Sequence, residues 1–171
     1  DKCIKTNDRV SCYNGCKIPS VCKREICSAV SEVSLMILYF SGTGNSLYVA
    51  KKLAELTGDT AVPISAIHER CQRIQDRIIG FVFPVYFGDL PDPVQDFIRQ
   101  VRFQKSTYFY GIATCGSTAG RALKTMDRIL QRQQCALSYG AVLPMIANST
   151  IASRRHIRYD TNRLDHADEL I

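Results

Sequence analysis

One stretch constrains this chain more than any other: a short apolar run that passes directly into a glycine-rich loop and then into a helical pattern. The apolar run Met36–Phe40 is followed by the loop Ser41–Ser46, and apolar residues at helical spacing begin at Leu47. Glycines let the loop turn sharply with its N–H groups exposed. The new helix adds unpaired N–H groups and the positive end of its dipole. The stretch therefore predicts a strand, a tight loop and a helix that together bind an anion such as a phosphate.

The candidate phosphate-binding residues are neutral, offering hydroxyl, amide and backbone donors. They are Ser41, Gly42, Thr43, Gly44, Asn45 and Ser46. The loop contains no Lys or Arg, so it does not match the P-loop, which requires G-x-x-x-x-G-K-[ST]. The dinucleotide fingerprint G-x-G-x-x-G is incomplete, because Leu47 stands where its third glycine belongs. A glycine-rich turn without a ligand stays open as the alternative.

Length and composition favour one globular domain with at most a small appendage. The chain has 171 residues, of which 46% are hydrophobic and 22% are charged, an ordinary globular balance. Its apolar runs are too short to span a bilayer, and no signal-peptide pattern opens the chain. We therefore expect a cytoplasmic protein with no membrane segment. Because the chain begins with Asp1 and not with Met, we also expect a fragment or a processed product.

The formal net charge is +6, which can attract acidic partners or nucleic acid. The Lys and Arg residues are scattered among acidic residues, however, and no run of five like charges occurs. This pattern is typical of a solvated surface. We therefore expect no nucleic-acid binding.

The cysteines divide the chain into a cysteine-rich extension, residues 1–34, and a domain, residues 35–171. The extension contains Cys3, Cys12, Cys16, Cys22 and Cys27, and the domain contains Cys71, Cys115 and Cys135. The isolated cysteines of the domain are typical of a reduced, cytoplasmic protein. The extension lacks the C-x2-C pairs of zinc and iron–sulfur sites, and its odd number leaves one cysteine unpaired in any internal disulfide scheme. This favours an irregular or artefactual segment over a metal site, an iron–sulfur cluster or a disulfide framework.

From Val33 onward, strand and helix patterns alternate. The expected strands are Leu35–Phe40, Ala61–Ile64, Ile78–Val85, Tyr108–Ala113 and Leu137–Met145. The expected helices are Ser46–Thr57 with Gly58 as its C-cap, a short surface helix through Ile64, Ile67, Cys71 and Ile74, then Pro91–Val101, Gly120–Gln133 and a shortened final helix from about Thr161. Such alternation predicts an α/β fold with a doubly wound, five-stranded parallel sheet and helices on both of its faces.

Ligands of such sheets bind beyond the carboxyl ends of the strands, so the loops that follow the strands should form one site. The second of these loops, Pro84–Pro91, carries Tyr86 and Phe87, on which a flat ring could stack. The third, Thr114–Gly120, is small and polar, and Cys115 within it is interpreted as a small residue that fits the space. Aromatic residues that merely cap the core are the alternative for the second loop.

Three segments together resemble the flavodoxin superfamily: Ile37–Ser46, Phe83–Phe87 and Ala113–Gly116. They are most similar to the flavodoxin-like half of flavodoxin–ferredoxin fusion proteins of anaerobes, over about Met36 to Asn148. Ser41–Ser46 matches the flavodoxin pattern [ST]-x-T-G-x-[ST] at every position. The chain departs from the family in its basic charge, in its lack of Trp and in having no ferredoxin half after Ile171.

The resemblance implies FMN as cofactor, with its phosphate on the first loop and its ring against the other two. The residues so implied are Ser41, Gly42, Thr43, Gly44, Asn45, Ser46, Pro84, Val85, Tyr86, Phe87, Gly88, Asp89, Thr114, Cys115, Gly116, Ser117 and Gly120. It also implies a redox partner such as a ferredoxin or a reductase.

The leading hypothesis is an electron-transfer protein in which the flavin carries the redox chemistry and the protein sets its potential. No catalytic side chain is expected. Stacking on Tyr86 or Phe87, and a negative charge at Asp89, would disfavour the fully reduced ring, and rotation of the Phe87–Gly88 peptide would offer a carbonyl to the flavin N5. Two alternatives stay open. One is an FMN-dependent NAD(P)H:quinone or flavin reductase, and the other is a scaffold of the same fold without flavin.

Overall fold

The computed structural model describes residues 35–67, 73–146, 168, 169 and 171. Its elements follow one another in the order β1 (Leu35–Tyr39), α1 (Asn45–Thr57), β2 (Ala61–Pro63), the 3₁₀ helix η2 (Ile64–Ala66), β3 (Arg73–Ile74), β4 (Ile78–Pro84), α2 (Asp92–Gln100), β5 (Arg102–Phe103), β6 (Tyr108–Cys115), α3 (Ala122–Gln131) and β7 (Leu137–Pro144).

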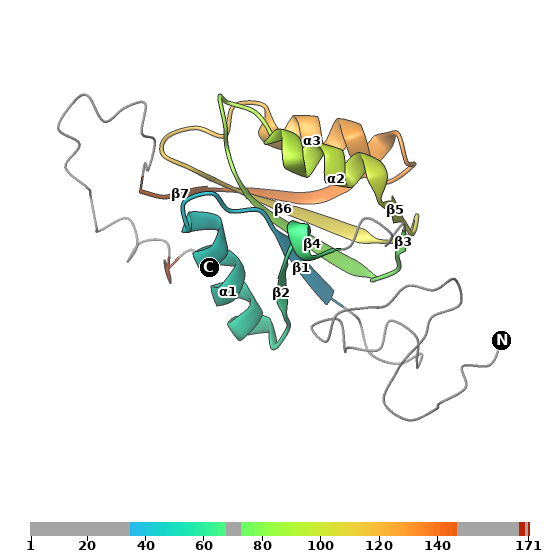
Figure 1. Ribbon diagram of the computed structural model, residues 1–171, viewed down its shortest axis with the longest axis horizontal. Coiled ribbons are helices and arrows are strands. Elements are labelled where there is room, and N and C mark those ends of the chain that lie inside the picture. Colours follow the sequence, from blue (N-terminus) through green and yellow to red (C-terminus); the bar gives the residue numbers. More distant parts are fainter. Residues whose placement is uncertain (1–34, 68–72, 147–167, 170) are drawn as a thin grey trace.

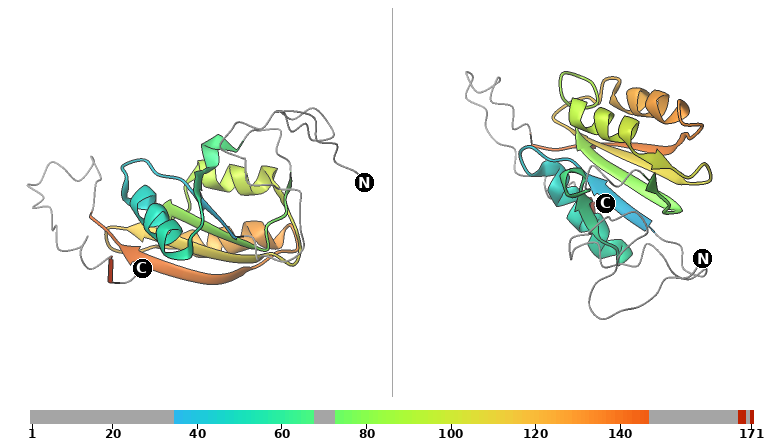
Figure 2. Two further views of the ribbon diagram at one scale, coloured as in Figure 1. Left: turned by 90° about the horizontal axis from the view of Figure 1, so that it is seen from below. Right: turned by 45° about the vertical axis from the view of Figure 1, so that its right-hand side comes forward.

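Five strands form one parallel sheet in the order β2-β1-β4-β6-β7. The chain builds outward from β1 to β2 on one side and then crosses to β4 on the other (Figure 1). The carboxyl ends of β1 and β4 therefore flank the topological switch point, where ligands of doubly wound sheets bind. The predicted fold class is confirmed: α1 lies on one face of this sheet, and α2 and α3 lie on the other (Figures 1 and 2).

Each face of the sheet has its own hydrophobic core, because successive side chains of a strand point to opposite faces. In β4, Phe81 and Phe83 pack in the larger core with residues of α2 and α3, whereas Val82 packs with Val49 and Ala50 of α1. The unbroken apolar run of β4 thus reflects burial on both of its faces.

The predicted long helices and the sheet strands all occur, with boundaries that differ by no more than two residues. Gly58 caps α1 in the left-handed conformation, with a φ of 70°, as expected for a glycine after the last helical turn. Pro91 precedes α2 directly, and Pro93 lies in its first turn, where a missing N–H costs nothing. Local signals therefore located these elements correctly.

The short helix predicted through Ile64, Ile67, Cys71 and Ile74 is wrong. Ile64 begins the 3₁₀ helix η2, and Ile74 belongs to β3, which pairs in parallel with β5 in a separate two-stranded sheet. Cys71 lies outside the described residues. The apolar spacing of these isoleucines imitated a helix, but the partner of β3 is a strand about thirty residues away, which periodicity does not detect.

Three further expectations fall wholly or largely outside the described residues: the cysteine-rich extension, residues 1–34; the final helix from Thr161; and the end of the flavodoxin resemblance at Asn148. In the part of the chain that the structure describes, no helix is both long enough and apolar enough to cross a membrane.

Candidate functional site

The three predicted loops meet at the carboxyl edge of the sheet: loop 1 (Ser41–Ser46), loop 2 (Pro84–Pro91) and loop 3 (Thr114–Gly120). The Ser46 and Thr114 hydroxyls are hydrogen bonded at 2.8 Å, joining loops 1 and 3. Val85 N–H donates to the Thr114 carbonyl at 2.9 Å, joining loops 2 and 3. Direct contacts thus bring the three loops together, and their role as one ligand site stays a prediction.

Loop 1 presents an exposed set of donors at the start of α1. Gly42, Thr43 and Gly44 are exposed, and Gly44 adopts a φ of 102°, which favours glycine. The Ser41 hydroxyl accepts a hydrogen bond from Gly44 N–H at 3.1 Å. Tyr48 N–H makes the first intrahelical bond, to the Gly44 carbonyl, so the N–H groups before it have no partner within the helix. Loop 1 therefore places hydroxyl and backbone donors at the exposed start of α1, and its binding of an anion stays a prediction.

Two of the candidate phosphate ligands use their side chains to anchor loop 1. Asn45 Nδ2 donates to the Ile146 carbonyl at 2.8 Å, which ties the loop to the residues after β7. Ser46 is buried, and its hydroxyl bonds Thr114. The side chains of Asn45 and Ser46 therefore bond within the protein, so these residues would bind an anion through their backbone N–H groups.

Loop 2 contains a tight turn at Phe87 and Gly88. Tyr86 and Asp89 exchange two backbone hydrogen bonds, of 3.1 and 2.9 Å, and the two residues between them have φ values of 51° and 73°. Two successive positive φ angles are typical of a type I′ turn. Phe87 is 96% exposed, and a non-glycine residue in this conformation costs about 1–2 kcal/mol. Such a costly, solvent-facing aromatic residue suggests a ligand contact.

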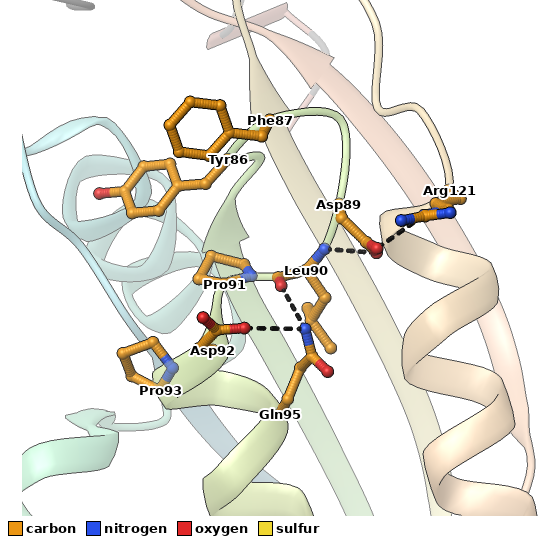
Figure 3. Close-up of a pocket in the computed structure, with 9 residues that line it drawn as sticks. All are labelled: Tyr86, Phe87, Asp89, Leu90, Pro91, Asp92, Pro93, Gln95 and Arg121. Atoms are coloured by element: carbon orange, nitrogen blue, oxygen red, sulfur yellow. Dashed lines mark hydrogen bonds and ion pairs between the residues drawn. The ribbon is translucent and has the colours of Figure 1, made fainter.

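The Tyr86 side chain lies over loop 1. Its ring packs edge-on against Phe40, with centroids 6.2 Å apart, and its hydroxyl is so near Gly42 that a Cβ there would collide with it. Figure 3 shows the rings of Tyr86 and Phe87 on the side of loop 2 away from Asp89 and Arg121. A side chain at position 42 would therefore require the Tyr86 hydroxyl to move.

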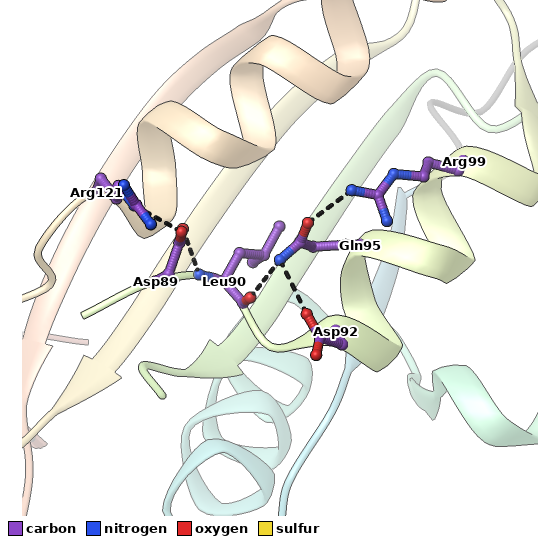
Figure 4. Close-up of polar contacts among 6 residues, drawn as sticks. All are labelled: Asp89, Leu90, Asp92, Gln95, Arg99 and Arg121. Carbon is purple, nitrogen blue, oxygen red and sulfur yellow. Dashed lines mark hydrogen bonds and ion pairs between the residues drawn. The ribbon is translucent and has the colours of Figure 1, made fainter. Parts of the chain in front are cut away.

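Loops 2 and 3 are held together by a clamp made of Gly88, Asp89, Gly120 and Arg121. Arg121 Nε binds Asp89 Oδ2 at 2.7 Å, and Arg121 N–H donates to the Gly88 carbonyl at 2.8 Å. Gly120 has a φ of 54°, and a Cβ on it would collide with the Gly88 carbonyl. Figure 4 shows this network continuing through Leu90 to Gln95 of α2.

Asp89 is ionised within this clamp. Burial by itself would raise the pKa of its carboxyl, but hydrogen bonds from Thr125, from Leu90 N–H and from Arg121, together with the Arg121 charge, outweigh burial and lower the pKa below its usual value. Asp89 therefore carries the negative charge expected from the sequence, but Arg121 offsets that charge at 2.7 Å, and its effect on a flavin stays a prediction.

The sequence analysis did not identify Arg121 as a site residue. One signal was available: an acidic residue in loop 2 and a basic residue directly after loop 3, both expected at the same edge of the sheet. What the sequence did not show is that the side chains of these two residues, which are 32 positions apart, meet.

The remaining predicted residues divide into buried supports and an exposed rim. Pro84 pairs with Thr114 in the sheet, and Thr114 and Cys115 are buried at the end of β6. Cys115 is buried, and its interpretation as a small residue that fits the space stays a prediction. Gly116 is half-buried and Ser117 is exposed, so the two lie nearer the surface.

A cavity of about 320 Å³ opens between loop 2 and the start of α2 (Figure 3). Its lining residues are Tyr86, Phe87, Asp89, Leu90, Pro91, Asp92, Pro93, Gln95 and Arg121. Of these, Gln95 bonds the Leu90 carbonyl at 2.8 Å and Asp92 at 3.4 Å. The cavity therefore combines aromatic and proline surfaces with polar groups that are already paired.

No protein-family model matches this chain, and no curated protein matches it. Several solved structures do match this chain. The Trp repressor binding protein of Bacillus subtilis aligns with a TM-score of 0.53 at 15% identity, over 81% of this chain and 97% of its own. Megasphaera elsdenii flavodoxin in its two-electron reduced form aligns with a TM-score of 0.52 at 15% identity, over 81% of this chain and 100% of its own. A short-chain flavodoxin associated with a bacterial microcompartment aligns with a TM-score of 0.50 at 15% identity, over 81% of this chain and 95% of its own.

Proposed function

We propose that this chain, which has the flavodoxin-like fold, binds FMN and transfers electrons. The observation that carries the proposal is loop 1: an exposed loop with neutral donors at the N-terminus of α1, directly at the switch point between β1 and β4. Ligands bind at this place in doubly wound sheets. The likeness to two flavodoxins agrees with the proposal.

The phosphate of FMN fits the donor set of loop 1. The Thr43 side chain is exposed beside Gly42 and Gly44, and the start of α1 favours negative charge. Gly44 N–H already donates to an oxygen, that of Ser41, so a phosphate oxygen could take over this bond. Neutral donors suffice for a phosphate that is bound and not transferred.

The flavin ring fits the exposed aromatic surface of loop 2. Phe87 is 96% exposed, and a flat ring gains both area burial and stacking against it. Because Gly88 and Gly120 are in direct contact, the ring would lie on the Phe87 side of the clamp and not between these glycines. Bound FMN would supply the electron chemistry, and the chain would orient and shield it.

Loop 2 retains one adjustable group, the Phe87–Gly88 peptide. Within the described residues, the loop is held through Tyr86, Asp89 and the Gly88 carbonyl, and no hydrogen bond holds the Phe87–Gly88 peptide itself. Its rotation toward the flavin N5 therefore stays a proposal. Replacing Gly88 with Ala makes a change of φ costly, and unchanged midpoint potentials in that variant would remove the proposal.

The decisive experiment is an FMN titration of the full chain, followed by absorbance and by quenching of flavin fluorescence. Gly44→Ala and Gly58→Ala form a matched pair, because both glycines have positive φ and an added Cβ would meet nothing within 4 Å at either. We expect Gly44→Ala to weaken FMN binding by about tenfold or more and Gly58→Ala to leave it unchanged. Wild-type protein that binds no FMN would favour the flavin-free scaffold.

The cavity beside Phe87 favours one second candidate, an FMN-dependent reductase. It offers about 320 Å³ next to the proposed ring position, where a nicotinamide or a quinone could approach. Oxidation of NADPH by the FMN-loaded chain alone would favour this activity, whereas reduction only by a protein donor would favour electron transfer.

A further inference from the structure

The outward face of α3 carries a basic ridge composed of Arg121, Lys124, Arg128 and Arg132. All four residues are exposed. At about 100° of rotation per residue they fall within an arc of about 80° on the helix. The ridge begins at Arg121, which belongs to the clamp of the candidate site, and extends away from that site along α3.

Apart from Arg121, these cations have no acidic partner among the described residues. The one acidic residue of α3 is Asp127, whose oxygens accept bonds from Leu137 N–H and from Gln131 Nε2. Asp127 is therefore engaged with β7 and with its own helix. The charge of Lys124 and Arg128 is free to face solvent or a partner.

Lys124, near the start of the ridge, runs against the usual arrangement of charge on a helix. Lys124 lies in the first turn of α3, which contains no acidic residue, although the positive end of the helix dipole disfavours cations there. Lys124 and Arg128 are like charges four residues apart, which costs about 0.2–0.5 kcal/mol. Arg128 lies in the last turn of α3, where the dipole favours a cation, so the uncompensated placement is that of Lys124.

The neighbouring helix α2 provides the contrast. Asp92 stands in its first turn and Arg99 in its last turn, as the dipole favours. Asp96 and Arg99 form an ion pair at 2.8 Å. The two helices lie side by side on one face of the sheet (Figure 1), so the unpaired charge is a property of α3 and not of that face as a whole.

We propose that the α3 ridge is the docking surface for an acidic electron-carrier protein. Complementary charge at the rim of a redox site steers a partner and speeds its association, and this ridge begins at the clamp, whose other side faces the proposed ring position (Figure 3). That the partner is an electron carrier rests on the proposed function, whereas its acidity follows from the ridge. An acidic protein is favoured over nucleic acid because the cations adjoin the candidate cofactor site.

The test measures binding of the full chain to a fluorophore-labelled acidic [2Fe–2S] ferredoxin as probe. Lys124→Glu/Arg128→Glu removes the centre of the ridge and leaves Arg121 intact. Arg102→Glu/Lys105→Glu changes the net charge equally at exposed positions in and just after β5. We expect the ridge variant to bind at least about tenfold more weakly at low salt and the control variant to bind within about twofold of wild type. The difference should nearly vanish at about 0.5 M salt.

Three results would each contradict the proposed docking surface. They are no binding of ferredoxin by wild type, an equal loss of binding in the ridge and control variants, and tighter binding of duplex DNA than of ferredoxin through the ridge. Lys124→Gln/Arg128→Gln should give an intermediate loss, and thermal unfolding checks that every variant is folded. FMN titration of the same samples tests the proposed function separately. Chains that bind ferredoxin through the ridge but bind no FMN would contradict the proposed function alone.

Discussion

Loop 1 and the clamp lie at the same edge of the sheet but are built on different principles. Loop 1 is one contiguous segment whose exposed donors lie within a few residues of one another, and its Gly44 N–H bonds the nearby Ser41 hydroxyl. The clamp joins residues of loops 2 and 3 through an ion pair, a backbone bond and a close glycine contact. Loop 1 is therefore stabilised mainly within one segment, whereas the position of loop 2 depends on contacts from a second segment.

The largest effect is expected where the clamp is tightest, at Gly120. Gly120→Ala places a Cβ against the Gly88 carbonyl at a positive φ, so loops 2 and 3 have to separate. We expect a loss of about 2–4 kcal/mol in the free energy of unfolding, measured by urea denaturation. Gly58→Ala, which adds only backbone strain, should cost about 1 kcal/mol. Equal losses in the two variants would show that the contact between the loops contributes nothing.

A smaller effect is expected from the ion pair of the clamp. Asp89→Asn should lower stability at neutral pH by about 1–2 kcal/mol, because it removes a charge-assisted bond to Arg121. Asp96→Asn breaks an exposed pair with Arg99 of similar length and should cost less than about 0.5 kcal/mol. Urea denaturation measures the loss in the free energy of unfolding for both variants. Equal losses would show that the ion pair of the clamp stabilises the fold no more than an exposed surface pair does.

The ionised Asp89 carboxylate should also make the stability of the folded chain depend on pH. The folded state lowers the pKa of Asp89 below its usual 3.8, so its stabilisation is complete above that value and is lost as the pH falls through the lower, folded pKa. Wild-type stability should therefore decline more steeply than that of Asp89→Asn as the pH falls below the usual pKa of 3.8. Parallel declines in the two proteins would assign the acid transition to other carboxylates.

The buried anchor of loop 1 is expected to matter less than the ion pair. Thr114→Val removes the hydroxyl that pairs with Ser46 at 2.8 Å inside the protein. We expect a loss of about 1 kcal/mol, the usual net value of one hydrogen bond. Thermal unfolding measures it, with Thr57→Val, at an exposed hydroxyl that bonds within its own helix, as the control that should change little.

The smallest effect on stability is expected in the exposed part of loop 1. Ser41→Ala removes only the acceptor for Gly44 N–H on the surface and should change stability by less than about 0.5 kcal/mol. If loop 1 binds the FMN phosphate, Ser41→Ala/Thr43→Ala should nevertheless weaken FMN binding about tenfold. The double variant Ser65→Ala/Ser106→Ala, at two exposed positions, serves as the control. Equal FMN affinities of the two double variants would show that loop 1 does not bind FMN.

Local order in the sequence accounts for most of what was predicted correctly. The apolar run of β4 is buried on both faces, and Gly58 caps α1, because each of these signals depends only on neighbouring residues. The segment Ile64–Ile74 was predicted wrongly because β3 exists only through its pairing with β5. Arg121 was missed for the same reason, since its partner Asp89 comes from another loop.

The amino-acid sequence by itself therefore determined the α/β architecture, the order of the sheet-forming segments and the position of a tight glycine-rich loop between β1 and α1. All of these follow from apolar periodicity and from the conformational freedom of glycine, which act over a few residues. Only the tertiary structure decided that Asn45 and Ser46 anchor loop 1, that Arg121 neutralises Asp89 and that Tyr86 covers Gly42. These contacts join residues that approach one another only when the parallel strands have aligned their carboxyl ends, so no local pattern encodes them.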